Sequence, residues 1–161
     1  MDLLEFFGPQ LDQPQGNLLI YFRFQPKIIG RTRLQKLMFL YEREVLHQNL
    51  FDYTPYKYGP FSGSLTSAMD ELIELGMIRE QIRNYSNPNF GSSSRYEITD
   101  EGIAMANRMI ENVAPKDREK VEEFIHRYGY KEMNHILEFV YSEYPEFTSE
   151  SIIKDLVMNY N

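Results

Sequence analysis

Residues 77–102, MIREQIRNYSNPNFGSSSRYEITDEG, carry the pattern that decides the predicted fold. Within them, residues 77–85 and 95–98 show the alternation of apolar and polar side chains that is typical of strands. The polar stretch from Ser86 to Ser94 contains Asn-Pro and Gly turn signals, so it is expected to be the loop of a hairpin. Thr99 then predicts a helix start, because its hydroxyl can accept a backbone N–H of the first turn.

A helix is predicted before this hairpin over residues 32–47, with Thr32 as its cap and Gln35 in the capping-box position. Its buried stripe is expected to be Leu34, Leu37, Met38, Tyr41 and Val45. The positions between the apolar ones carry charge, and those side chains are expected to face away from the core. They are Arg33, Lys36, Arg43 and Glu44.

A second helix is predicted over residues 62–75, with Ser62 or Ser64 as its cap and Gly76 as its stop. Its inward positions are expected to be Leu65, Ala68, Met69, Leu72 and Leu75. The remaining positions form an acidic face without a basic residue: Gly63, Thr66, Ser67, Asp70, Glu71 and Glu74. A helix that reads base edges in a DNA groove normally offers Arg, Lys, Asn or Gln, so this helix is a poor candidate for major-groove recognition.

The segment between these two helices is rich in aromatic residues, namely Phe51, Tyr53, Tyr56, Tyr58 and Phe61. Their alternation predicts a short strand broken at Pro55, and Gly59-Pro60 is a turn signal. Alternating aromatics beside a helix start are typical of core and cross-strand packing. The alternative is a patch that binds a partner, in which Tyr56 and Phe61 are the members expected to be exposed.

The flanking segments complete the predicted architecture. Residues 17–25 are predicted as a short helix that ends before Pro26, and residues 1–16 as an N-terminal segment with a short element and a loop. Residues 115–161 are predicted as three helices, with Pro115 opening the first and Thr148 or Ser149 capping the last. The order of elements predicts an α+β, mostly α fold, a winged helix-turn-helix over residues 17–114, with residues 115–161 packed on it as a helical extension.

Two motifs carry a resemblance to a known family: Arg31-Thr-Arg-Leu-Gln-Lys-Leu37 and Tyr56-Lys-Tyr-Gly-Pro-Phe-Ser62. Together they resemble uncharacterised bacterial and archaeal winged-helix proteins of the YwgA-like type. The chain is more distantly similar to the SocA-like, or Panacea, antitoxin domain, which also pairs a Leu-Gln-Lys-Leu helix with a later Gly-Pro segment. That resemblance implies a protein that neutralises a toxin or acts as an adaptor for a protease machinery through protein contacts.

Composition limits the functions that the chain can have. The 161 residues include no cysteine, which excludes disulfides and thiolate chemistry, and the net charge of -7 weighs against non-specific nucleic-acid binding. Met1 to Phe7 has no basic leader and no long apolar run, so we expect a cytoplasmic protein without a membrane partner. The three histidines lie in separate segments without metal-ligand spacing, so no metal, cofactor or catalytic residue is predicted.

Positive charge is concentrated in the N-terminal part of the chain and in the predicted hairpin. Arg31, Arg33 and Lys36 are the best candidates for an anion contact, although the same side chains can instead have partners within the chain, such as Glu71 or Glu74. The full set of cations predicted to contact a partner or nucleic acid is Arg31, Arg33, Lys36, Lys57, Arg79, Arg83 and Arg95.

These patterns predict a non-catalytic regulator that binds a macromolecule, with a protein as the expected partner. The alternative is a DNA-binding transcriptional regulator that uses the N-terminal basic cluster and the wing arginines, which would favour backbone and minor-groove contacts. A homodimer would form through the terminal helices, at residues 132–157, where apolar side chains repeat at helical spacing.

Overall fold

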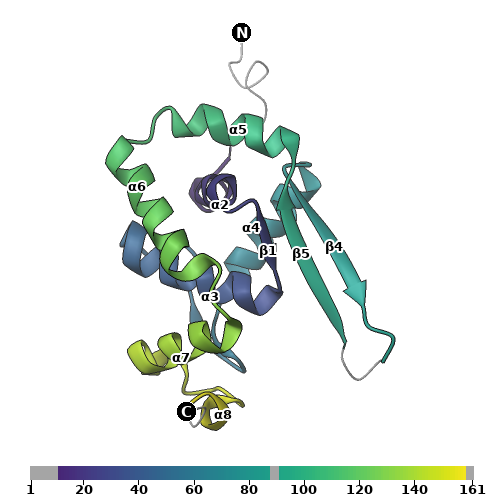
Figure 1. Cartoon of the computed structure of the whole chain (residues 1–161), viewed down its shortest axis with the longest axis vertical. Coiled ribbons are helices and arrows are strands. Elements are labelled where there is room, and N and C mark those ends of the chain that lie inside the picture. The colour runs from purple at the N-terminus through teal and green to yellow at the C-terminus, as the bar shows by residue number, and fades with distance from the viewer. Residues whose placement is uncertain (1–10, 88–90, 159–161) are drawn as a thin grey trace.

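The computed structural model describes residues 11–87 and 91–158 as an α+β, mostly helical protein (Figure 1). Its helices are α2 (Gln13–Phe24), α3 (Arg31–Tyr41), α4 (Gly63–Glu74), α5 (Asp100–Ile110), α6 (Pro115–Phe124), α7 (Met133–Glu143) and α8 (Lys154–Met158). Short π-helical turns extend α3 over Glu42–Leu46 and α6 over Ile125–Gly129, and a 3-10 turn covers Pro145–Phe147. Its strands are β1 (Lys27–Ile29), β2 (Thr54–Tyr56), β3 (Gly59–Phe61), β4 (Ile78–Asn84) and β5 (Ser92–Ile98).

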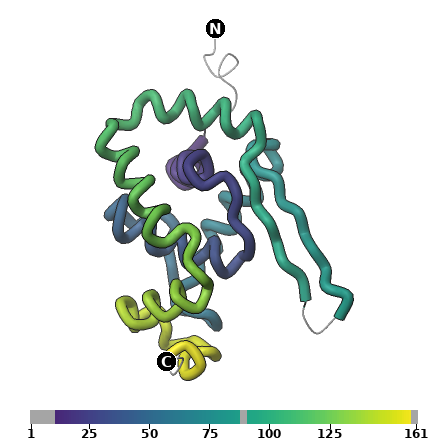
Figure 2. Tube along the Cα trace, in the orientation of Figure 1, coloured from purple at the N-terminus to yellow at the C-terminus, as the bar shows by residue number. Residues whose placement is uncertain are grey.

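Helix α2 is the central element of the core. Leu18, Leu19, Tyr21 and Phe22 are fully buried, and helices α5, α4 and α6 pack against this helix, which Figure 2 shows almost end-on. The Tyr21 ring makes edge contacts with three other aromatic rings, those of Phe22, Tyr41 and Phe124. Burial of large aromatic side chains contributes more apolar area per residue than any other choice, so α2 holds the helical layers together.

The predicted helix over residues 17–25 is confirmed, but it begins earlier than expected. Asp12 and Gln15 form a capping box, with the Asp12 carboxylate accepting from the Gln15 N–H at 2.9 Å. Pro14 lies in the first turn, where its missing N–H leaves no bond unmade. The prediction of a loop at residues 13–16 is therefore wrong, and the short element predicted further upstream lies outside the described residues.

Helix α3 begins at Arg31 rather than after Thr32. Gly30 occupies the N-cap position with φ 104, and no side chain caps the helix, so the prediction of Thr32 as cap is wrong. The stripe of Leu34, Leu37, Met38 and Tyr41 is buried as expected. The other side of α3 is buried too, because the segment that follows the helix folds back over it.

The β4–β5 hairpin is confirmed and is longer than predicted. Strand β5 begins at Ser92, so part of the predicted loop belongs to the strand, and each strand pairs over seven residues. Strand β1, which was not predicted, pairs antiparallel with the other side of β5 and completes a sheet in the order β1-β5-β4. The far part of the hairpin projects beyond the helical body (Figure 1).

The helix boundaries after the hairpin agree with the sequence at most positions. Thr99 caps α5 through an N–H···O bond from Gly102, and Pro115 occupies the first turn of α6. Thr148 does not cap the last helix; it is buried, and its hydroxyl donates to the Pro145 carbonyl. Helix α8 is only five residues long, and among the described helices none has the length and apolar character needed to cross a lipid bilayer.

Gly102 marks the tightest backbone contact between the hairpin and α5. A Cβ at this position would lie 2.2 Å from the Met77 carbonyl oxygen and 2.7 Å from Ile98 Cγ1. We expect Gly102→Ala to lower the free energy of unfolding by about 2–3 kcal/mol, because a backbone oxygen cannot move aside as a flexible side chain can. Urea unfolding monitored by circular dichroism measures the change.

The matched control is Gly63→Ala in the first turn of α4, where a Cβ meets no atom within 4 Å. This variant should be neutral or more stable by up to about 1 kcal/mol, since alanine restricts the unfolded chain. Equal effects at the two positions would contradict the steric explanation for Gly102.

Candidate functional site

The two motifs that carry the family resemblance meet at a buried hydrogen-bonded contact. The side-chain amide of Gln35, on α3, accepts from the Ser62 N–H at 2.9 Å and donates to the Ser62 carbonyl at 3.0 Å. Both residues are buried. The glutamine therefore satisfies both backbone polar groups at the point where strand β3 ends and helix α4 begins.

Ser62 ties two further segments to the same point. Its hydroxyl accepts from the Leu65 N–H at 2.9 Å, which confirms Ser62 as the cap of α4, and donates to the Phe51 carbonyl. The carboxylate of Glu42 accepts the N–H groups of Leu50 and Phe51. Residues 50–62 are thus fixed against α3 by side chains that the helix itself provides.

Lys36 lies in this interior and not on the surface. Its side chain is 2 % exposed, and its ammonium donates to the Pro60 carbonyl at 2.9 Å. Burial lowers the pKa of the Lys36 ammonium to about 7. The expectation that Lys36 faces away from the core is wrong, because the β2–β3 hairpin covers that side of α3.

An open cleft of about 590 Å³ lies between α3, α4, the β2–β3 hairpin and strands β4 and β5. Its floor is apolar and contains Leu34, Leu65 and Met69. Tyr56 and Tyr58 stand at one end with 47 % and 46 % of their surface exposed. A cleft of this size, with an apolar floor and polar groups around it, has the character of a binding site.

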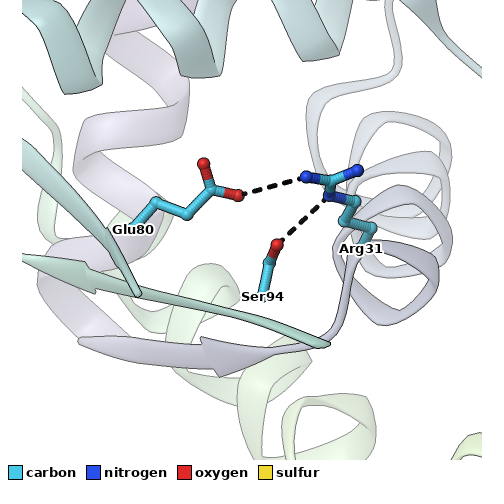
Figure 3. Close-up of polar contacts among 3 residues, drawn as sticks. All are labelled: Arg31, Glu80 and Ser94. Carbon is cyan, nitrogen blue, oxygen red and sulfur yellow. Dashed lines mark hydrogen bonds and ion pairs between the residues drawn. The ribbon is translucent and has the colours of Figure 1, made fainter. Parts of the chain in front are cut away.

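Charged side chains also line the cleft. Arg31 lies there with 67 % of its side chain exposed; its Nη2 is 3.7 Å from Glu80 Oε2 and its Nε donates to Ser94 Oγ at 3.2 Å. Figure 3 shows Glu80 and Ser94 directed from the hairpin toward the guanidinium group. Burial, and then the nearby Glu80 carboxylate, raise the pKa of Tyr96, which also lines the cleft.

The seven predicted cations do not form one cluster. Arg31 and the buried Lys36 line the cleft, whereas Lys57 is exposed at the turn of the β2–β3 hairpin, 5.9 Å from the Tyr56 ring centroid. Arg33 Nη1 donates to the Lys131 carbonyl at 2.5 Å. The remaining three lie on the sheet: Arg79, Arg83 and Arg95.

The aromatic segment divides as the core interpretation requires, with one correction. Phe51 and Tyr53 are buried, and the Tyr53 hydroxyl donates to the Gln35 carbonyl at 2.8 Å. Tyr56 is exposed as predicted, but Phe61 is half-buried beneath it and Tyr58 is the second exposed ring. The turn of this hairpin falls at Lys57-Tyr58 and not at Gly59-Pro60, which belongs to strand β3.

The outward face of α4 is acidic, as the sequence indicates. Thr66, Ser67, Asp70 and Glu74 are exposed, and Glu71 accepts a hydrogen bond from the Gln15 amide. Leu75, which was predicted to face inward, is exposed instead. The cation-free surface of α4 forms one wall of the cleft, through Thr66 and Asp70.

The chain matches no protein-family model and no curated protein. In the part of the chain that the structure describes, no three acidic or histidine side chains are grouped so that they could hold a metal ion. The cleft is therefore characterised by its own lining: an aromatic end, an apolar floor and the charged pair of Arg31 and Glu80.

The contact between Gln35 and Ser62 can be tested through stability. Gln35→Ala leaves two buried backbone groups of Ser62 without their partners, so we expect the free energy of unfolding to fall by about 3 kcal/mol. Gln48→Ala, at an exposed position beyond α3, is the control and should change it by less than about 0.5 kcal/mol. Urea denaturation measures the free energy of unfolding of both variants. If Gln35→Ala lowers it no more than Gln48→Ala does, the contact does not stabilise the fold as described.

The buried amine of Lys36 predicts a pH dependence of stability. Its pKa is about 7 in the folded protein and about 10.4 in the unfolded chain, so between these values the unfolded state binds more protons and stability rises with pH. Relative to Lys36→Met, the native protein should gain about 2 kcal/mol of unfolding free energy between pH 7 and pH 9. Urea unfolding of both proteins at several pH values measures the difference, in which the tyrosines common to both cancel. A constant difference would show that Lys36 keeps an ordinary pKa.

Proposed function

We propose that this chain is a non-catalytic, winged-helix regulatory protein that binds a protein partner in the cleft between α3, α4 and the β2–β3 hairpin. The observation that carries the proposal is the pair of half-exposed tyrosines, Tyr56 and Tyr58, at the end of an apolar cleft. Tyrosine is enriched at protein interfaces, because its ring supplies apolar area and its hydroxyl supplies a hydrogen bond.

The charge on α4 favours a protein over DNA as the occupant of this cleft. In the proposed winged-helix arrangement α4 takes the position of the DNA-recognition helix, yet its exposed face carries Asp70 and Glu74 and no cation. Carboxylates there repel phosphates, whereas a protein segment can approach them with polar or basic side chains. The Arg31 and Glu80 pair that also lines the cleft adds a donor and an acceptor for such a segment.

The resemblance to YwgA-like proteins and, more distantly, to the SocA-like antitoxin domain supports the same class of function. Both motifs line the cleft: Arg31–Leu37 supplies Leu34 of the floor, and Tyr56–Ser62 supplies the exposed tyrosines. A partner of the toxin or protease-adaptor type is therefore the one that we propose. The proposal places the protein in the cytoplasm, where such partners act.

Photo-crosslinking tests this proposal directly. A photoreactive phenylalanine analogue at position 58 should crosslink to a protein in cells of the native host, whereas the same analogue at position 130 should not. Tyr130 is a suitable control because it is more exposed than Tyr58 and does not line the cleft. Equal crosslinking at both positions, or none at position 58, would contradict a partner in the cleft.

A matched pair of variants gives the affinity contribution once the crosslinked partner is purified. Tyr56→Ser with Tyr58→Ser should weaken binding at least about tenfold, since tyrosine is enriched among the interface residues whose truncation costs more than about 1 kcal/mol. Tyr130→Ser should leave binding unchanged. Both variants change exposed residues, so their unfolding midpoints should stay close to that of the native protein.

A further inference from the structure

The strand register places four cationic side chains on one face of the three-stranded sheet. Residues that pair directly across antiparallel strands point to the same face. Lys27, Glu97 and Arg79 form one such row across the three strands, and Ile29, Arg95 and Gln81 form the next. We call this surface the outer face; its members are Lys27, Ile29, Arg79, Gln81, Arg83, Ser93, Arg95 and Glu97.

The outer face is open to solvent. The opposite face of the same strands carries Ile28, Ile78, Tyr96 and Ile98, which are buried against the helical body. All four cations of the outer face are exposed. Because the hairpin projects from the body (Figure 1), a large partner can reach this face without displacing a helix.

The charge of the outer face is opposite to that of the chain. The chain has a net charge of -7, yet this face has four cations against the single carboxylate of Glu97, which lies 3.5 Å from Arg79. Among the described residues, Lys27, Arg83 and Arg95 have no ion-pair partner. Since charges are screened beyond about 8 Å at physiological salt, an approaching polyanion responds to this local surface and not to the net charge.

The cationic surface continues toward the start of α3. A shallow hollow of about 660 Å³ is lined by Ile29, Ser93, Arg83 and Arg95, with Gln81, Ile82 and Tyr85. A neighbouring hollow of about 410 Å³ shares Ile29 and Ser93 with it and is lined by Arg31 and Arg33. Arg31 and Arg33 therefore lie next to the outer face, beyond Ile29 and Ser93, whereas Lys36 and Lys57 lie elsewhere.

We propose that the outer face binds the phosphodiester backbone of double-stranded nucleic acid. Arg79 and Arg83 are four residues apart on β4, roughly 13 Å, and Arg95 lies between them on the next strand. Gln81 and Ser93 add hydrogen-bond donors among the charges. Arginine, glutamine and serine side chains are the groups with which proteins hold phosphate oxygens, and such contacts supply most of the affinity that is independent of sequence.

The side chains of the outer face favour a duplex over a single strand. Sheets that bind single strands stack bases on aromatic residues of their strands, but the central strand β5 presents Ser93, Arg95 and Glu97 here. Helix α4 lies on the other side of the sheet: it lines the cleft together with Glu80 and Tyr96, whose side chains belong to the face opposite the outer face. A duplex on the outer face therefore contacts the strands and avoids the carboxylates of α4, and the site is independent of the cleft proposed for a protein partner.

The test is a titration of a fluorescent DNA duplex of about 20 base pairs with the native protein over a range of salt concentrations. Arg83→Ala with Arg95→Ala should weaken binding at least about tenfold at low salt and reduce the slope of log K against log salt by about two. Lys116→Ala with Lys120→Ala removes the same charge from the exposed surface of α6 and should leave binding within about twofold.

Further probes separate the backbone of a duplex from other polyanions. An RNA duplex of the same sequence should compete with the DNA, whereas a single strand of it should compete less well. The proposal is overturned if the native protein shows no salt-dependent binding at low salt or if both double variants lose affinity equally. It is also overturned if vesicles rich in phosphatidylserine bind the face more tightly than the duplex does.

Discussion

The side-chain amide of Gln35 holds both backbone polar groups of Ser62, and the positions of three elements depend on that contact. Ser62 directly follows β3, caps α4 and donates to Phe51 on the loop after α3. A buried backbone group that loses its partner costs free energy comparable to the whole net value of several ordinary hydrogen bonds. One glutamine on α3 therefore fixes where α4 begins, and with it the width of the cleft.

The burial of Lys36 follows from the same arrangement. With Gln35 directed toward Ser62, the next residue of α3 lies against strand β3, where its ammonium donates to the Pro60 carbonyl. Lysine reaches this carbonyl with a long apolar stem, and its amine can donate the bond with or without its charge. The amine that donates to this carbonyl is buried, and burial disfavours its charged form, so the pKa of Lys36 is lowered.

The sequence predicted the helices with clear caps and one-sided apolar stripes, such as α4 and α5, together with the hairpin between them. It failed where an element is buried on more than one side. All residues from Leu34 to Tyr41 are buried, so periodicity could not tell that Lys36 faces the interior. Strand β1 was missed because three residues are too few to show a period.

For the candidate site, the sequence identified the residues but not their grouping. Tyr56 and Arg31 were named for separate reasons, an aromatic patch and an anion contact, and the fold places both in the lining of one cleft. The sequence did not identify Lys27 as a candidate, because its neighbours on the outer face come from strands about 50 and 70 residues away along the chain. Register across strands is a property of the folded chain, so a charged sheet face of this kind is visible only after folding.

The two faces of the β4–β5 hairpin have opposite chemical character, and this difference follows from the two-residue period of a strand. Odd-numbered positions of β4 from Arg79 to Arg83 carry cations or an amide toward solvent, while Glu80 faces Arg31 and the cleft. A shift of the pairing by one residue would exchange the two faces, but Ile78, Tyr96 and Ile98 resist it, because it would expose them to water. The apolar core therefore fixes the register, and the register keeps Glu80 and the cleft apart from the basic sheet face. A protein with net negative charge can in this way present one surface to a protein and another to a polyanion without the two competing.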